Sequence, residues 1–143
     1  MKKHNKCYLD EKELVRDLIG YIRGLGVKGV FGEVQTPAGR IDVLTPRLLI
    51  EAKAIQSWKA GVGQLLAYGQ YHPQKRLVLF TFGRFYYFNQ DSNERDYGRR
   101  GAGKKLKKRT IKDVCDAHNI IHFYYHDGCD FNDFKEHLSK SLM

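Results

Sequence analysis

Three short apolar runs separated by turn residues constrain the fold of this chain most strongly. The stretch from Val27 to Ile55 reads VKGVFGEVQ, TPAGR, IDVLT, PR and LLIEAKAI. The β-branched and aromatic residues in the apolar runs favour strands, and the Pro and Gly residues between them favour turns. The sequence therefore predicts three consecutive strands that pair as a meander.

Helices and further strands surround this meander. Leu14, Leu18 and Ile22 recur at helical spacing in a segment that Asp10 can cap and that Gly26 can end. Helices are predicted at about residues 9–25, 57–71, 110–119 and 131–142, and strands at 76–82, 85–88 and 120–125. Elements in this order predict a single α/β domain over residues 1–143, with a mixed central β-sheet flanked by helices.

The charge of the chain narrows its class of partner. Its 143 residues carry a formal net charge of +9, which favours nucleic acid first and an anionic membrane surface second. Three cysteines argue against a disulfide framework, and the lysine-rich start lacks the apolar stretch of a signal peptide. Because no apolar run reaches the roughly 18 residues of a membrane span, we expect no membrane partner. The expected location is intracellular, in the cytoplasm or at the nucleoid, or in the nucleus of a eukaryotic host.

Three charged residues interrupt the apolar strands. Asp42 lies at the start of the second strand, and Glu51 and Lys53 lie two apart on the third, so these two project to the same face. Pairing of the two strands can bring Asp42 beside Glu51. Neighbouring carboxylates repel unless a cation lies between them, and carboxylates with a main-chain carbonyl and waters suit Mg²⁺ or Mn²⁺.

Lys53 would lie beside such an ion. It could orient or help to deprotonate an attacking water, or stabilise the charge that builds on a phosphate. These are the parts of a phosphodiester hydrolase. The alternative is an ion-pair network of Asp42, Glu51 and Lys53 on an exposed sheet face.

The helix predicted after the third strand carries a polar pair. Gln64 and Tyr68 lie four residues apart, on one face with the small residues Ala60 and Gly61. This face suits the close approach of a phosphate backbone. A structural hydrogen bond on a packed helix is the alternative.

In this pattern the chain resembles the PD-(D/E)xK, or restriction-endonuclease-like, nuclease superfamily over close to half of its length. The superfamily's motif corresponds to Asp42, Glu51 and Lys53, and the resemblance implies that the Ala52 carbonyl also binds the metal. The chain departs from the motif at Ile41, where a proline would precede the aspartate.

Two further features carry the resemblance. Gln64 and Tyr68 match the Q-x-x-x-Y helix of some members, and Glu11 is similar to the acid at the start of the first helix in archaeal Holliday-junction resolvases. The resemblance implies a restriction-endonuclease-like core, a Mg²⁺ or Mn²⁺ cofactor, catalysis by Asp42, Glu51, Lys53 and Gln64, and a homodimer or higher oligomer.

Glu33 and Arg40 flank the predicted site. Glu33 lies on the first strand of the meander and could extend the metal shell or pair with Arg40. Arg40 could bind a phosphate through two parallel hydrogen bonds, or form an ion pair with Glu33 or Asp42.

A basic segment, from about residue 89 to 109, predicts a long loop that contacts phosphates and binds them in a salt-dependent way. The alternative is a solvated charge run without a ligand. The candidate phosphate-binding residues of this basic loop are Arg99, Arg100, Lys104, Lys105, Lys107, Lys108 and Arg109.

Three histidines, His118, His122 and His126, are spaced four apart further along the chain. On a helix this spacing would suggest zinc, but four residues along a strand span roughly 13 Å, which is too far for ligands of one ion.

The sequence and the resemblance together predict a Mg²⁺-dependent nuclease that hydrolyses DNA. Endonucleolytic cleavage is expected, whether structure-dependent, junction-resolving or site-specific. A nucleic-acid-binding module on the same fold without catalysis is one alternative, and an RNA endonuclease is another.

Overall fold

The computed structural model describes residues 8, 10–83, 108–126 and 128–138. The predicted strand at 85–88 and most of the predicted basic loop lie outside this part of the chain. The elements are α1 (Glu11–Gly24), β1 (Phe31–Thr36), β2 (Gly39–Leu44), β3 (Leu48–Ala54), the 3-10 turn η1 (Ile55–Ser57), α2 (Trp58–Gly69), β4 (Arg76–Phe82), α3 (Lys108–Ala117), β5 (Ile120–Tyr125) and α4 (Phe131–Leu138).

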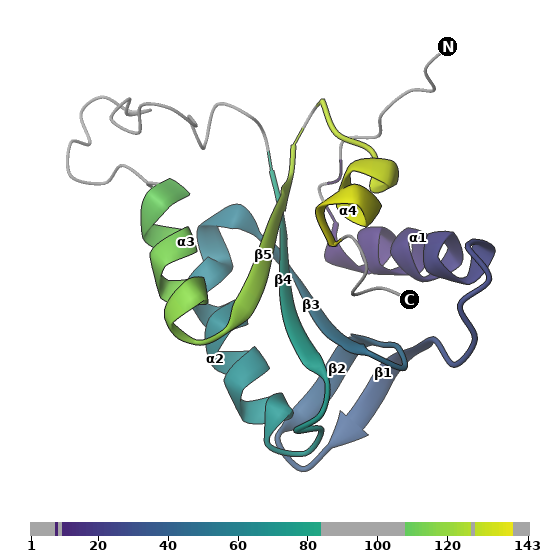
Figure 1. The fold of residues 1–143 in the computed structure, drawn as a ribbon, viewed down its shortest axis with the longest axis horizontal. Helices are drawn as coiled ribbons and strands as arrows, with labels where there is room; N and C mark the ends of the chain where they lie inside the picture. The colour runs from purple at the N-terminus through teal and green to yellow at the C-terminus, as the bar shows by residue number, and fades with distance from the viewer. Residues whose placement is uncertain (1–7, 9, 84–107, 127, 139–143) are drawn as a thin grey trace.

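Five strands form one mixed sheet in the order β1-β2-β3-β4-β5 (Figure 1). β1, β2 and β3 pair antiparallel, which confirms the predicted meander, whereas β3, β4 and β5 run parallel. α2 makes the crossover from β3 to β4. Because β3 lies at the centre of the sheet, its first five residues are buried, which accounts for its nearly continuous apolar run.

Helices cover both faces of this sheet: α1 and α4 pack on one face, and α2 and α3 pack on the other (Figure 1). The predicted mixed α/β sheet flanked by helices is therefore confirmed. Leu14, Leu18 and Ile22 of α1 are completely buried against the sheet. Burial of each such side chain stabilises the fold by about 1.5–3 kcal/mol. This packing fixes the first turn of α1 beside β3.

Acidic caps set where α1 and α4 begin. The Asp10 carboxylate accepts the backbone N–H of Lys12 at 3.1 Å, as predicted. Asp130 caps α4 by accepting the N–H of Asp133 at 3.2 Å, and the Asp133 carboxylate in turn accepts the N–H of Asp130 at 2.8 Å. Each cap satisfies N–H groups that a helix start leaves without a partner.

The tight turn between β2 and β3 is held by side chains. Thr45 Oγ1 accepts the backbone N–H groups of Arg47 at 3.2 Å and Leu48 at 2.9 Å. Lys75 Nζ donates to the carbonyls of Thr45 and Pro46 at 2.9 and 2.8 Å. These bonds fix the register of the hairpin that carries the candidate site.

The start of α3 differs from the prediction. The helix begins at Lys108, so Lys108 and Arg109 are helical and do not belong to a loop. Ile111 and Cys115 are fully buried against the sheet, and this amphipathic packing favours a helix that extends through the basic residues before it. In the described part of the chain, no helix is both long enough and apolar enough to cross a membrane.

Candidate active site

The candidate site lies where β2 and β3 separate. Val43 and Ile50 form the register pair nearest to the site. Beyond this pair, two carboxylates accept backbone N–H groups in place of the carbonyls of the neighbouring strand. Glu51 Oε2 accepts the N–H of Asp42 at 2.9 Å, and Asp42 Oδ2 accepts the N–H of Ala52 at 2.8 Å. The predicted neighbourhood of Asp42 and Glu51 is therefore present, and it is built into the hairpin itself.

Burial gives this pair of carboxyl groups unusual electrostatics. The Glu51 side chain is almost fully buried, and this loss of hydration, together with the nearby charge of Asp42, raises the pKa of Glu51 to about 8. Burial also raises the pKa of Asp42. A hydrogen bond between the two carboxyl groups favours the proton on Glu51 and the charge on Asp42.

The donor set of this site fits a small divalent cation. A cation would stabilise the charged form of both carboxyl groups against the burial that raises their pKa values, and it would replace the proton on Glu51. The Ala52 carbonyl points to the same side of β3 as its N–H, towards Asp42. Two carboxylates and a carbonyl are all-oxygen ligands of the kind that Mg²⁺ and Mn²⁺ prefer. Among the described residues, no group of three or more His, Cys, Asp or Glu forms a metal site, so water would complete the coordination.

Lys53 reaches this region past a glycine of α2. A Cβ atom at Gly61 would lie 2.9 Å from Lys53 Cγ and 2.5 Å from Leu79 Cδ1. Gly61 therefore leaves the space through which the stem of Lys53 passes. Lys53 is close enough to Asp42 and Glu51 for its positive charge to lower the pKa of each carboxyl group.

Gln64 and Tyr68 lie one turn apart on α2. The Gln64 Oε1 atom is buried without a hydrogen-bond partner in the described structure. Tyr68 packs on Gly39, where a Cβ atom would come within 2.8 Å of the Tyr68 hydroxyl. Burial, then the charges of Glu51 and Asp42, raise the pKa of Tyr68. Tyr68 therefore lies near the carboxylate pair, and Gln64, one turn earlier on α2, has a buried acceptor that is unused.

Glu11 approaches the site from the first turn of α1. Its carboxylate accepts the backbone N–H of Ala54 at the end of β3. Partial burial raises the pKa of Glu11, whereas the charge of Lys53 lowers it. Glu11 therefore faces the sheet at the end of β3.

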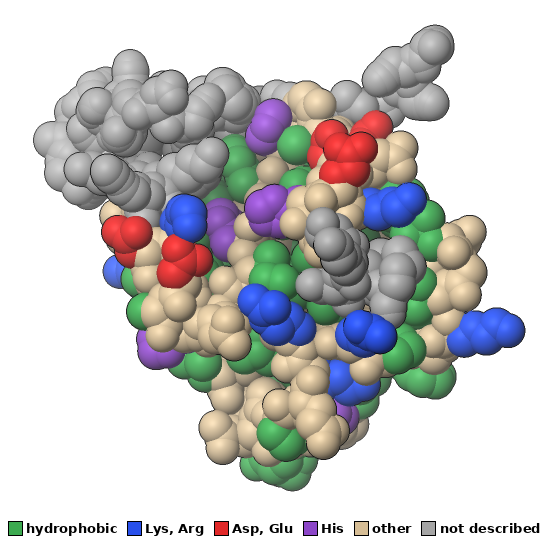
Figure 2. Space-filling view, in the orientation of Figure 1, with side chains coloured by type: hydrophobic (Ala, Val, Ile, Leu, Met, Phe, Trp, Pro, Cys, Tyr) green, Lys and Arg blue, Asp and Glu red, His purple; other side chains and the backbone are tan. Residues whose placement is uncertain are grey.

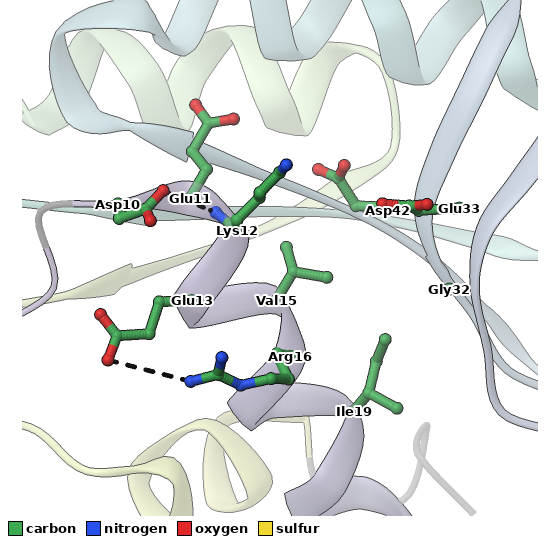
Figure 3. A pocket seen from close by; sticks show the side chains of 10 residues that line it. All are labelled: Asp10, Glu11, Lys12, Glu13, Val15, Arg16, Ile19, Gly32, Glu33 and Asp42. Carbon is green, nitrogen blue, oxygen red and sulfur yellow. Dashed lines mark hydrogen bonds and ion pairs between the residues drawn. The ribbon is translucent and has the colours of Figure 1, made fainter.

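A cleft of about 730 Å³ opens between α1 and the β1–β2 hairpin, and it gives access to Asp42. In Figure 3, Glu11 and Lys12 of α1 project above the cleft, while Asp42 and Glu33 lie together on the strand side. Glu51 does not line the cleft and is almost fully buried.

Glu33 has a strained backbone beside the site. Its φ angle is 52°, in the left-handed region that only glycine adopts without cost. The Glu33 carboxylate forms a long ion pair with Arg40 at 3.7 Å, in which both side chains are mostly exposed. This is one of the two arrangements predicted for Glu33 and Arg40, and an exposed pair of this kind stabilises the fold little.

The structure adds a polar pair that the sequence did not reveal. Thr81 is the register partner of Lys53 on β4 and is completely buried. Its hydroxyl lies 2.9 Å from His122 Nε2 on β5. The sequence feature that could have indicated this pair is the threonine within the apolar run RLVLFTF.

Of the candidate phosphate-binding residues in the predicted basic loop, the structure describes only the last two. Arg99, Arg100, Lys104, Lys105 and Lys107 lie outside the described residues, and only the backbone of Lys108 and Arg109 is described.

Comparison with known proteins finds similarity to three KilA-N domain-containing proteins of Acanthamoeba polyphaga mimivirus. The first is 42% identical over 94 residues, which is 66% of this chain and 21% of that protein. The second is 40% identical over 72 residues, covering 50% of this chain and 27% of that protein. The third is 40% identical over 50 residues, which is 35% of this chain and 13% of that protein.

These matches cover part of each protein. The matched region spans about a quarter or less of the length of these relatives. No family model matches the chain, and no solved structure matches it.

Proposed function

We propose that this domain binds nucleic acid and hydrolyses its phosphodiester bonds at Asp42, Glu51 and Lys53, as a nuclease with a restriction-endonuclease-like core. The observation that carries the proposal is the carboxylate pair at the end of the β2–β3 hairpin. Both carboxyl groups are partly or fully withdrawn from water, their pKa values are raised, and a lysine lies beside them. Perturbed carboxyl groups at a cleft are typical of catalytic sites.

The fold supports the same proposal. A mixed sheet flanked by helices is what the resemblance implies, and α1 and α2 bring Glu11 and Tyr68 close to the carboxylate pair. A structural ion-pair network on an exposed face would not account for a site in which Glu51 is 2% exposed. Burial of these charges costs stability unless they hold a ligand.

Each side chain has a role in the proposed reaction. Asp42, Glu51 and the Ala52 carbonyl would hold Mg²⁺, which supplies a polarised water and stabilises negative charge on the phosphate. Lys53 would orient the attacking water or offset charge on the phosphate. Gln64 would accept a hydrogen bond from Lys53 or from the positioned water through its unused Oε1. Glu11 would assist from the other side of the cleft.

A second candidate is a nucleic-acid-binding module without catalysis. The comparisons favour it, because the matched relatives are named as KilA-N domain-containing proteins and KilA-N domains are DNA-binding. Under this candidate the net charge of +9 provides affinity for phosphates, and the carboxylate pair holds the hairpin together. DNA is the expected substrate or ligand under both candidates, with RNA as an alternative. A homodimer or higher oligomer also remains a prediction.

A cleavage assay separates the two candidates. Labelled duplex, single-stranded and four-way-junction DNA, and RNA, are incubated with the protein in Mg²⁺, Mn²⁺ or EDTA. The informative variants are Glu51→Gln, whose amide oxygen can still accept the N–H of Asp42, and Lys53→Met. Glu136→Gln and Lys28→Met are matched controls, because both residues are exposed and lie outside the site.

The nuclease proposal predicts metal-dependent cleavage that both site variants lose while they still bind the substrate. The controls should cleave like the wild type. Binding of every substrate without cleavage in either metal would favour the binding module. Equal cleavage by wild type and Glu51→Gln would remove Glu51 from the mechanism.

A further inference from the structure

A second cavity, of about 630 Å³, lies at the opposite edge of the sheet from β1. The cavity lies along the first half of β5, the last strand, and residues of α3 and α4 also line it. Its polar lining consists of Arg76, Lys112, Asp116, Asn119, His122 and His137. Cavities of this size hold small ligands such as nucleotides.

The lining of this β5 cavity is cationic. Lys112 Nζ forms an ion pair with Asp116 at 2.7 Å, which offsets the one carboxylate in the lining. The Arg76 guanidinium makes a long contact of 3.5 Å with Asn119 Oδ1. Its five N–H donors form a fork that matches two phosphate oxygens. Arg76 therefore contributes a net positive charge before either histidine is protonated.

The two histidines are held in fixed positions. His137 Nε2 lies 2.9 Å from the backbone carbonyl of His122, so this nitrogen carries the hydrogen, because a carbonyl can only accept. His122 Nε2 lies 2.9 Å from the hydroxyl of Thr81 in the sheet. Fixed rings lose little conformational entropy when a ligand binds.

Surface charge agrees with this arrangement. Figure 2 shows histidine, lysine and arginine side chains near the middle of the face on which β5 lies, with acidic side chains towards its margins. An anionic ligand would meet an attractive potential over this face.

We propose that the β5 cavity binds a phosphate group, presented either by a nucleic-acid strand or by a free nucleotide. Arg76 and Lys112 would bind the phosphate oxygens, and Asn119 and His137 would contact the rest of the ligand. The nucleic-acid source rests on the proposed function, whereas the phosphate site itself does not.

Histidine NMR tests the proposal. The imidazole signals of His122 and His137 are followed while AMP is added, and then a short oligodeoxynucleotide with either a 5′-phosphate or a 5′-hydroxyl end. The test variant is Arg76→Ala. The matched control is Lys28→Ala, which removes one exposed positive charge from the loop before β1.

The proposal predicts that at least one phosphate ligand shifts both histidine signals. Arg76→Ala should weaken that binding about tenfold, because a charged hydrogen bond is lost, and Lys28→Ala should not. A preference for the 5′-phosphate end identifies a terminal phosphate, equal binding of both oligonucleotides identifies the backbone, and binding of AMP alone identifies a free nucleotide.

The absence of histidine shifts with all three ligands would overturn the proposal, and so would an equal loss of affinity in both variants. Oligonucleotide binding that leaves the histidines and the Arg76→Ala affinity unchanged would overturn the β5 cavity as a phosphate site while the proposed function stands. Binding of AMP without any oligonucleotide binding would support the cavity and contradict the proposed function.

Discussion

The side chains of Asp42 and Glu51 each accept a backbone hydrogen bond from the other residue's strand. The Glu51 carboxylate accepts the N–H of Asp42 on β2, and the Asp42 carboxylate accepts the N–H of Ala52 on β3. The site and the hairpin are therefore one structure. Truncation of Glu51 to alanine would leave a buried N–H without its acceptor, which costs about 1–3 kcal/mol. Glutamine is the sharper substitution, because it removes the charge and keeps the acceptor.

The first prediction concerns stability and pH. Folding raises the pKa of Glu51 from its ordinary value of 4.5 to about 8, so between these values the folded state binds more protons than the unfolded state. Stability without metal therefore falls as pH rises through this window. Glu51→Gln should flatten the fall and raise Tm by several degrees near pH 8, since it removes a buried charge.

Thermal unfolding in EDTA from pH 4 to pH 9 measures this effect. Glu136→Gln, an exposed acid on α4, is the control and should follow the wild type. A Glu51→Gln protein whose Tm falls as steeply with pH as that of the wild type would contradict the assigned burial of the Glu51 charge.

The second prediction concerns the space for Lys53. Gly61→Ala would place a methyl group 2.9 Å from Lys53 Cγ and 2.5 Å from Leu79 Cδ1. We expect lower stability, by about 1–3 kcal/mol, and a loss of cleavage as Lys53 moves. Gly63→Ala is the control: nothing lies within 4 Å of its added methyl group, and alanine favours the helix. Denaturant unfolding and cleavage rates measure both variants, and equal effects would exclude a steric role for Gly61.

The third prediction separates stability from activity at Gln64. Its buried Oε1 has no partner among the described residues, so Gln64→Leu removes a polar atom whose burial is uncompensated. We expect unchanged or increased stability together with reduced cleavage. Unfolding in EDTA and single-turnover cleavage provide the two readouts. A destabilised variant with normal cleavage would show that Gln64 serves the fold alone.

The fourth prediction concerns the strained residue beside Asp42. Glu33→Gly should stabilise the protein by up to about 1 kcal/mol, because glycine adopts a φ of 52° without the steric cost. Glu33→Gln keeps the backbone strain and removes the charge near Asp42. If Glu33 serves catalysis, both variants cleave more slowly although only the glycine variant is more stable; unchanged cleavage in both would restrict Glu33 to its ion pair with Arg40.

The neighbourhood of Asp42 and Glu51 could be predicted because it depends on local pattern. Turn residues delimit the strands, and side-chain alternation places Glu51 and Lys53 on one face. The exchange of backbone N–H groups between the two carboxylates could not be predicted, because it depends on where the β2–β3 ladder ends.

Tertiary packing accounts for the other differences. The left-handed conformation of Glu33 carries no signal in its residue type, since glutamate rarely adopts it. The early start of α3 depends on packing of Ile111 and Cys115 against the sheet. The Thr81–His122 contact joins two strands far apart in sequence, whose register becomes visible only in the folded sheet.

Cation binding by the Asp42–Glu51 pair is the central claim, and Mn²⁺ titration followed by electron paramagnetic resonance tests it most directly. The signal of free Mn²⁺ is measured with wild type, Glu51→Gln and the Glu136→Gln control, without nucleic acid. We predict saturable binding by the wild type and the control, weakened at least tenfold in Glu51→Gln. Equal Mn²⁺ binding by all three proteins, or none by the wild type, would contradict a cation site at this pair.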